Sequence, residues 1–270
     1  MPDRTPPDWM RLPGLARGTW RYVHERSIAR HYHQFVAETP LCELDADYVI
    51  EHLPRPKDAI RSAADGEATR VLDLGCGDGR ISRVLADAGF EVLAIDLSQP
   101  MLETLLESCP TSNVLPVRAN LVQLECLRPG IADHAVCLFS TLGMIHGKEH
   151  RLQCLRGVRR AVRTGGLLVL HVHWVGAAIR EPRGVRKLFS DAWRSVISRD
   201  HEFGDSFYAY RGLSEMYLHR FTLKELRDAL RSTDWRIRQV DWISEDGSRL
   251  LDSSSRSSGF FVVAEAVPRV

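Results

Sequence analysis

The stretch VLDLGCGDGR, residues 71–80, decides the fold class. Its first four residues read as a short buried strand, and three glycines follow before a helix-like segment begins. Glycine is needed where a chain turns sharply and a ligand comes close to the backbone, because a Cβ atom would fill that space. The stretch therefore predicts a strand, a ligand-binding loop and a helix in succession.

Outward from this stretch, short apolar runs alternate with helix-length segments. Strands separated in this way imply right-handed crossovers and a parallel sheet with helices on both faces. Two later runs, 235–243 and 259–266, lie too close together for a helix between them and predict an antiparallel pair. We expect an α/β, doubly wound fold, with a mostly parallel seven-stranded sheet and a C-terminal antiparallel hairpin. The runs assigned to the other five strands are residues 71–74, 91–97, 114–117, 134–140 and 166–174.

The composition excludes several classes of protein. Apolar residues make up 44% of the 270 residues, which provides a sizeable core and excludes a fully disordered chain. Lys and Arg number 36 against 35 acidic residues, so no global field marks a nucleic-acid or acidic-membrane binder. The longest weakly charged run, 165–179, falls short of the about 20 apolar residues that a membrane span needs. We therefore expect no membrane partner.

The six cysteines are scattered through the sequence without a C-x-x-C pair, which predicts reduced thiols and a cytoplasmic protein. No Cys/His cluster of zinc spacing occurs, so we expect no metal site. Cys76 lies inside the glycine loop, where no base is at hand, and a structural role is expected for it.

The spacing of the glycines narrows the choice of ligand. A dinucleotide fingerprint would need a third glycine at position 80, where Arg80 stands, so a dinucleotide-dependent oxidoreductase is disfavoured. The stretch instead resembles motif I of class I S-adenosylmethionine-dependent methyltransferases, D-x-G-x-G-x-G, matched by Asp73, Gly75, Gly77 and Gly79. An acid at a strand end can accept hydrogen bonds from a positively charged amino-acid ligand. The resemblance implies S-adenosylmethionine as cofactor and S-adenosylhomocysteine as product.

An acid at the end of the second strand supports this resemblance. Asp96 lies 17 residues after Gly79, near the end of the run EVLAIDL. In sheets of this kind, a carboxylate at this place accepts hydrogen bonds from both ribose hydroxyls. The alternative is that Asp96 or Ser98 only caps the helix that starts near Gln99.

The resemblance also implies contacts with the adenine. Met101 either touches the ring or only packs in the core. Asn120 stands where the family usually has an acid that accepts from the adenine amino group, and its carbonyl oxygen can serve in the same way. The alternative for Asn120 is a simple turn asparagine. Leu121 would offer its backbone N–H to the ring.

The family places the methionine moiety of the cofactor against the end of the fourth strand, here at Phe139 and Ser140, with ordinary strand packing as the alternative. The cofactor-binding residues expected from the resemblance are Asp73, Gly75, Gly77, Gly79, Asp96, Leu97, Met101, Asn120, Leu121, Phe139 and Ser140.

Four regions follow from this interpretation. Residues 1–45 form an N-terminal helical lid, in which Asp45 can cap a second short helix. Residues 46–175 form the Rossmann-like core that binds S-adenosylmethionine. Residues 176–220 form a substrate-side insertion after the fifth strand, and residues 221–270 complete the core with a helix and two strands.

Methyl transfer is an in-line displacement, so the protein must hold the acceptor, exclude water and remove a proton where the nucleophile needs it. The candidate bases are His146, shortly after the fourth strand, and His219, in the run MYLHRFT. His171 and His173 alternate along the fifth strand and point to one face. On the lid, His31 and His33 flank Tyr32, and these three could shape the acceptor pocket.

The acceptor is expected to be a small molecule, because aromatic residues crowd the predicted acceptor side. The alternative is tRNA. The run YLHRFTLKEL resembles methyltransferases related to those that modify the wobble uridine of tRNA, and residues 151–163 carry five arginines without an acid. A third possibility is a noncatalytic cofactor-binding protein of the same fold. The sequence indicates no oligomeric state.

Overall fold

The predicted alternation of strands and helices builds one large sheet. The structure, a computed structural model, describes residues 5–7, 10–36, 39–56, 68–109, 111–198 and 201–268. Within these ranges the strands of the large sheet are, in chain order, β1 (Arg70–Leu74), β2 (Glu91–Asp96), β3 (Val114–Arg118), β4 (His134–Cys137), β5 (Leu167–His173), β8 (Trp235–Ser244), β9 (Leu250–Leu251) and β10 (Ser257–Ala266).

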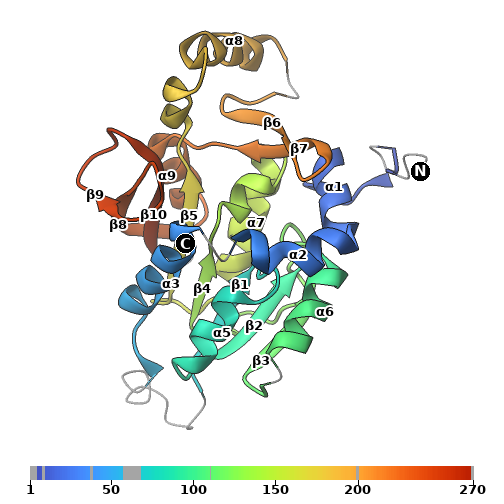
Figure 1. Ribbon diagram of the computed structural model, residues 1–270. Coiled ribbons are helices and arrows are strands. Elements are labelled where there is room, and N and C mark those ends of the chain that lie inside the picture. Colours follow the sequence, from blue (N-terminus) through green and yellow to red (C-terminus); the bar gives the residue numbers. More distant parts are fainter. Residues whose placement is uncertain are drawn as a thin grey trace.

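The order across this sheet is β3-β2-β1-β4-β5-β10-β8-β9 (Figure 1). Strands β1 to β5 pair in parallel. Strand β10 pairs antiparallel with β8, as predicted, and also with β5, so that it lies between them. The seven predicted strands are confirmed, and the two-residue β9 is added at the edge. The fourth strand is shorter than predicted, because it ends at Cys137 and not at Ser140.

Helices cover both faces of the sheet, because its central strands are apolar on both sides. In β1, Val71 faces one core cluster, while Leu72 and Leu74 face the other. The first cluster includes side chains of α3 (Pro40–His52), α5 (Arg80–Asp87) and α6 (Gln99–Ser108). The second includes side chains of α7 (Lys148–Ala161) and α9 (Leu223–Arg231). The doubly wound α/β architecture is confirmed.

Between β5 and α9 the chain leaves the sheet to form η3 (Val175–Arg180), α8 (Gly184–Ile197), β6 (Asp205–Tyr210) and β7 (Leu213–His219). Strands β6 and β7 pair antiparallel as a separate sheet. The two ends of this segment lie side by side, because the Phe221 backbone nitrogen donates to the His173 carbonyl oxygen at 2.8 Å. Helix α8 packs against η3 and lies at the end of the molecule farthest from β1, β2 and β3 (Figure 1).

The N-terminal part of the chain covers the carboxyl ends of the parallel strands with α1 (Arg17–His24) and α2 (Arg26–Val36). Helix α1 packs against β7 and α6, and α2 packs against α6. The next helix, α3, spans the expected boundary between residues 45 and 46. Asp45 is therefore not its cap, contrary to the sequence interpretation. The helix begins at Pro40, which suits a first helical position, and Asp45 is buried inside it.

No helix in the described part of the chain is both long and apolar enough to cross a membrane. The six cysteines, all of which lie in the described ranges, are free thiols.

Candidate active site

The three glycines of the loop after β1 are required by their backbone conformation, and two of them also by the packing around them. Gly75, Gly77 and Gly79 have φ values of 72°, 56° and 84°, in the left-handed region that other residues avoid. A Cβ atom on Gly75 would come within 2.4 Å of Thr141, and one on Gly79 within 1.9 Å of Leu105. A Cβ atom on Gly77 would lie 3.5 Å from Tyr32 of the lid, an ordinary contact. The first and third glycines thus avoid clashes with packed side chains, whereas at Gly77 it is the left-handed φ that requires glycine.

Asp96 ties this loop to the end of β2. Its Oδ2 accepts a hydrogen bond from the Gly77 backbone nitrogen at 2.9 Å, and its Oδ1 accepts one from the Ser98 nitrogen at 2.8 Å. The cap of α6 is Ser98, whose hydroxyl oxygen accepts from the Met101 nitrogen. The capping alternative therefore belongs to Ser98, and Asp96 remains at the ligand loop. Burial raises the pKa of Asp96, and the hydrogen bonds from backbone N–H groups oppose that rise.

Asp73 is the penultimate residue of β1, which directly precedes the glycine loop. Its Oδ2 accepts a hydrogen bond from the Ser82 hydroxyl at 2.6 Å. Burial raises the pKa of Asp73 to about 6, against the lowering effects of Ser82 and the Arg80 guanidinium. Burial also raises the pKa of the Cys76 thiol well above its usual range, which fits a structural role for that residue.

One cavity brings most of the expected cofactor residues together. Gly79 is the exception, because it turns toward Leu105 of α6 and does not line the cavity. The ten expected residues that line it are Asp73, Gly75, Gly77, Asp96, Leu97, Met101, Asn120, Leu121, Phe139 and Ser140.

The remaining wall of the cavity comes from the lid and the insertion. The lid contributes Tyr22, Val23 and Tyr32, among others, and the β6–β7 sheet contributes Tyr208, Tyr210, Met216 and Leu218. Met101 is buried against Ile28 and Ala29 of α2, so it both packs in the lid interface and lines the cavity. The lid and the insertion thus close the cavity together.

The side chain of Asn120 is partly occupied by backbone groups. Its Oδ1 accepts from the Val122 nitrogen at 3.1 Å, and its Nδ2 donates to the Pro13 carbonyl oxygen at 3.0 Å. The turn alternative is therefore realised, and the amide also fixes the segment that leads into the lid. An adenine contact at Asn120 stays a prediction, to which the second lone pair of Oδ1 is suited.

Two strained residues follow β4. Phe139 and Ser140 have φ values of 51° and 59°, an uncommon conformation for residues other than glycine. The Ser140 nitrogen donates to the His171 carbonyl oxygen, and the Ser140 hydroxyl accepts from the His173 nitrogen, each at 3.2 Å. Phe139 and Ser140, expected at the end of the fourth strand, thus form a turn that is hydrogen-bonded to β5. Strained backbone of this kind clusters at ligand sites.

Neither expected base lies at the cavity. The ring of His146 packs edge-on against Tyr217 on the other side of β7. His219 is buried, and its two ring nitrogens lie 2.8 Å from Asp205 Oδ1 and Glu225 Oε1. Since carboxylates only accept, both nitrogens carry protons and His219 has no free nitrogen for an acceptor. The structure gives neither histidine the position of a general base, because β7 presents Met216 and Leu218 to the cavity instead.

His173, the last residue of β5, does line the cavity. Its Nδ1 is buried and has no hydrogen-bond partner among the residues that the structure describes. Burial, together with the neighbouring His171 and Arg220, lowers the pKa of His173 to about 3. The ring is therefore neutral at physiological pH. The sequence signal was the pair of histidines along β5, from which only the structure selects His173.

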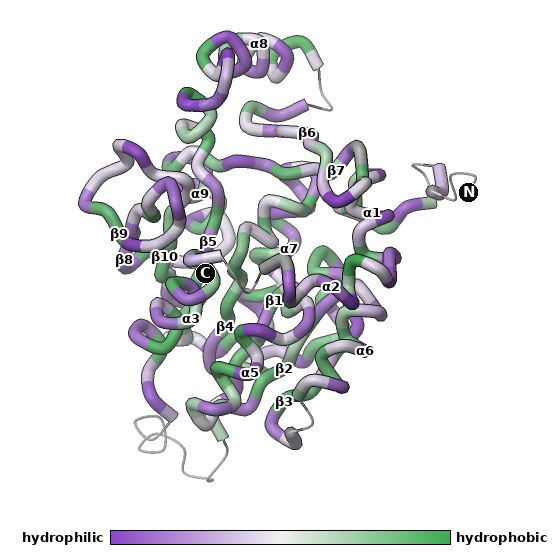
Figure 2. Tube along the Cα trace, viewed as in Figure 1, coloured by the Kyte–Doolittle hydropathy of each residue, from purple (hydrophilic) through white to green (hydrophobic). Residues whose placement is uncertain are grey.

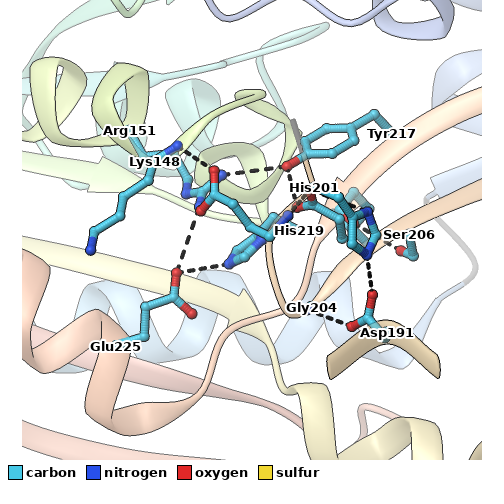
Figure 3. A network of polar contacts seen from close by, with 12 residues as sticks. Lys148, Arg151, Asp191, His201, Gly204, Ser206, Tyr217, His219 and Glu225 are labelled. Carbon is cyan, nitrogen blue, oxygen red and sulfur yellow. Dashed lines mark hydrogen bonds and ion pairs between the residues drawn. The ribbon is translucent and has the colours of Figure 1, made fainter. Parts of the chain in front are cut away.

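Polar contacts hold the insertion to the core behind the cavity wall (Figure 3). Asp205 accepts from the Tyr217 hydroxyl at 2.6 Å as well as from His219. Arg151 of α7 forms ion pairs with Glu202 at 2.5 Å and with Glu225 at 3.6 Å. This network joins β6, β7, α7 and α9, and thereby fixes the wall that carries Met216 and Leu218.

The same network contains a possible set of metal ligands. Within the described residues, ligand atoms of Glu202, His219 and Glu225 lie within 4.8 Å of one another. The buried guanidinium of Arg151 pairs with both of these glutamates, so it already supplies a cation there. The expectation of no metal stays a prediction.

Of the three lid residues singled out in the sequence, Tyr32 lines the cavity. His31 is exposed, and its Nδ1 bonds to the Ser27 carbonyl oxygen of its own helix. The side chain of His33 lies outside the described part of the structure.

The chain was compared with known proteins. A family profile described as a methyltransferase domain matches residues 71–166. The malonyl-[acyl-carrier protein] O-methyltransferase of Pseudescherichia vulneris is 31% identical over 147 residues, which are 54% of this chain and 51% of that protein. The chain spans about half or less of the length of the curated relatives it matches.

Solved structures show the same fold. A S-adenosylmethionine-dependent methyltransferase from Methanosarcina mazei aligns with a TM-score of 0.60 at 21% identity, covering 78% of this chain and 97% of that one. The 1,6-didemethyltoxoflavin-N1-methyltransferase of Burkholderia thailandensis aligns with a TM-score of 0.59 at 17% identity, covering 96% and 94%. The glycine motif, the cavity around it and the matched domain all indicate a domain that binds S-adenosylmethionine. Residues 71–166 thus match a methyltransferase domain, and the chain has the fold of S-adenosylmethionine-dependent methyltransferases of known structure.

Proposed function

We propose that this protein transfers a methyl group from S-adenosylmethionine to a small-molecule acceptor. The observation that carries the proposal is a cavity that is lined both by the glycine loop and Asp96 and by tyrosines of the lid and the insertion. A site of this form can hold a cofactor at one end and an acceptor at the other.

The residues at the loop end fit this cofactor. Gly77 and Tyr32 of the lid both line the cavity, and without a side chain on Gly77 a ligand can reach the backbone of the loop. Each oxygen of Asp96 uses one lone pair on a backbone nitrogen and keeps another for a ribose hydroxyl. Asp73 and Asp96 place two carboxyl groups at the cavity, which suits a cationic amino-acid ligand and disfavours a pyrophosphate.

Bound S-adenosylmethionine supplies an electrophilic methyl group on a sulfonium, which is a good leaving group. The chain's own task is to position the acceptor and exclude water. The lid and the β6–β7 sheet provide the enclosure. His173 is the residue we assign to the acceptor, because its neutral, unpartnered Nδ1 can accept a hydrogen bond from an O–H or N–H nucleophile.

Two observations favour a small acceptor over tRNA. The cavity is lined by Tyr22, Tyr32, Tyr208 and Tyr210, which suit a planar molecule. The related Burkholderia structure holds 1,6-didemethyltoxoflavin, a small molecule.

The arginines also argue against tRNA, because the five arginines of residues 151–163 are engaged within the chain. Arg151, Arg156 and Arg163 pair with carboxylates. Arg159 and Arg160 donate to backbone carbonyl oxygens. They therefore do not form the free basic stripe that the tRNA alternative needs.

Calorimetric titration with S-adenosylmethionine, S-adenosylhomocysteine and NAD tests the cofactor assignment. We expect binding of the two sulfur cofactors alone. Binding of NAD, or of none of the three, would overturn it.

Release of S-adenosylhomocysteine during a screen of planar phenols and N-heterocycles then separates an enzyme from a noncatalytic binding protein. Micromolar tRNA binding that weakens steeply with salt would favour the tRNA alternative instead.

His173 is tested in the same screen once an acceptor is found. His173→Leu should lower kcat with that acceptor by about 10²-fold or more while leaving S-adenosylmethionine affinity unchanged. His173→Gln, whose amide oxygen can still accept a hydrogen bond, should recover part of the acceptor affinity. Equal kcat values for the Leu variant and the wild type would remove His173 from the site.

A further inference from the structure

Helix α8 presents an apolar face to solvent. Val185, Phe189, Trp193 and Val196 recur at spacings of three and four residues, so they lie on one side of the helix, and Ile197 extends it. Their exposed fractions run from 54% to 81%. An apolar face of this size, on a protein whose other large side chains are mostly buried, marks a surface that binds something.

The other side of α8 holds it to the molecule. Gly184 is buried against the Ala178 backbone of η3, where a Cβ atom would come within 1.8 Å of the carbonyl oxygen. Asp191 accepts from the Gly204 nitrogen at 2.8 Å and lies against His201. The helix is thus anchored through small and polar residues, while its apolar face points away from the core. Figure 2 shows α8 as a projecting element with mixed apolar and polar residues.

Basic residues flank this face. Arg183, Arg186, Lys187 and Arg194 are exposed at or beside the helix, Arg186 next to the apolar stripe, and Lys187 and Arg194 on the side that also lines a cavity with Asp191. Among the described residues, Lys187 is the one of these four that pairs with an acid, at 3.0 Å from Glu181. The single acid within the helix, Asp191, is turned inward onto Gly204 and His201. The exposed surface of α8 therefore combines an apolar stripe with positive charge.

We propose that α8 docks this protein on an anionic lipid surface, which departs from the expectation of no membrane partner that was drawn from the sequence. A projecting helix with Trp and Phe on its apolar face and Lys and Arg beside it has the character of an interfacial helix. The association would be peripheral, with α8 lying in the headgroup region. It does not depend on the methyl transfer proposed above.

Shape and charge favour this occupant over others. A second copy that paired through the same face would bring the arginines of two helices together without acids to match them. A nucleic acid would use the arginines but gains little from Val185, Val196 and Ile197, which cannot stack on bases as aromatic rings do. A convex helix at the end of the molecule suits a planar layer rather than a groove-bound peptide (Figure 1).

Vesicle flotation with the full chain tests the proposal. We expect binding to vesicles of phosphatidylcholine with 30% phosphatidylglycerol, roughly this anionic fraction being enough for electrostatic attraction, and weaker binding to phosphatidylcholine alone or at high salt. Phe189→Ser with Trp193→Ser should lower the partition coefficient by about tenfold or more. Leu106→Ser, at an apolar side chain of α6 that is 55% exposed, is the matched control and should change little.

Two further variants test charge and depth. Arg186→Ser with Arg194→Ser should weaken binding to the anionic vesicles only, whereas Arg227→Ser with Arg231→Ser on α9 should not. Quenching by brominated lipid should fall in Trp193→Phe, which keeps the apolar character but removes that fluorophore.

Other outcomes overturn the proposal. Absence of flotation, or flotation equal in the wild type and the Phe189/Trp193 variant, rejects lipid docking. A dimer seen by sedimentation velocity that the same variant abolishes would assign the face to a second copy. Salt-sensitive RNA binding through α8, without flotation, would assign it to nucleic acid.

Discussion

The Oδ2 atom of Asp96, at the end of β2, lies 2.9 Å from the backbone nitrogen of Gly77. The acid expected to bind a ribose therefore also fixes the conformation of the glycine loop. Asp96→Ala removes an acceptor from two backbone N–H groups as well as from the ligand. We expect S-adenosylmethionine affinity to fall by about 2 to 4 kcal/mol and the free energy of unfolding by about 1 to 3 kcal/mol.

Calorimetry and denaturant unfolding measure these two effects of Asp96→Ala separately. Ser98→Ala is the control, since it removes the cap of α6 and should cost about 1 kcal/mol of stability without a comparable loss of affinity. A folded Asp96→Ala protein with unchanged affinity would show that the ribose assignment is wrong.

Gly77 and Gly79 should respond differently to alanine. At Gly79 the new Cβ atom would meet Leu105 at 1.9 Å, so we expect a loss of about 2 to 4 kcal/mol in the free energy of unfolding. At Gly77 the nearest side chain is 3.5 Å away, so about 1 kcal/mol of backbone strain is expected together with weaker cofactor binding.

Leu105→Ala in the Gly79→Ala background checks the cause of the Gly79 effect. If the Leu105 clash is responsible, the double variant loses less than the sum of the two single losses in denaturant unfolding. Additive losses would point to backbone strain alone.

Cofactor affinity should depend on the ionisation of Asp73. Burial raises its pKa to about 6, so the carboxyl is mostly ionised at pH 7 and mostly protonated at pH 5. Only the ionised form attracts a cationic amino group, so S-adenosylmethionine affinity should fall by about tenfold between those pH values. Titration calorimetry at both pH values measures this change. In Asp73→Asn the dependence should be absent, and a full dependence in that variant would assign it to another group.

His219 should make stability depend on pH. Burial lowers its pKa, but the hydrogen bonds to Asp205 and Glu225 outweigh that effect and raise it above the ordinary value. A raised folded pKa gives stability that is complete below the unfolded pKa of about 6.5 and is lost as pH rises through the folded value. Asp205, whose pKa its partners hold at about 2 despite burial, retains its charge throughout that window.

His219→Gln should therefore cost about 2 to 4 kcal/mol at pH 6 and less at pH 9, because it leaves Asp205 without its charged partner. Urea unfolding across this range gives the comparison. His31→Gln, on an exposed side chain, is expected to leave the curve unchanged. A constant loss from His219→Gln at every pH would indicate that the imidazole is held neutral.

The sequence predicts the parts of the site that are contiguous. The glycine spacing, Asp73 and Asp96 all lie in or just after a strand whose position the apolar runs define, and the structure brings them together. The start of α3 was also readable, because Pro40 favours a first helical turn more strongly than Asp45 favours a cap.

Other parts of the site depend on contacts between distant residues. His173 was one of two histidines along a strand, and only the arrangement of the cavity selects it. His219 looked available as a base because nothing in MYLHRFT shows that Asp205 and Glu225 enclose it. The left-handed turn at Phe139 and Ser140 is held by β5, whose His173 is 33 residues beyond Ser140 in the chain, so no local pattern predicts it.

The position of β10 has a consequence for synthesis on the ribosome. This strand lies between β5 and β8 and pairs with both, but it is synthesised after both of them. Until residues 257–266 leave the exit tunnel, one edge of β5 has no neighbouring strand, and β8 can pair only with the two-residue β9. Such unpaired edges invite aggregation in a nascent chain. The protein should therefore depend on chaperones during translation more than a fold whose strands pair in order of synthesis.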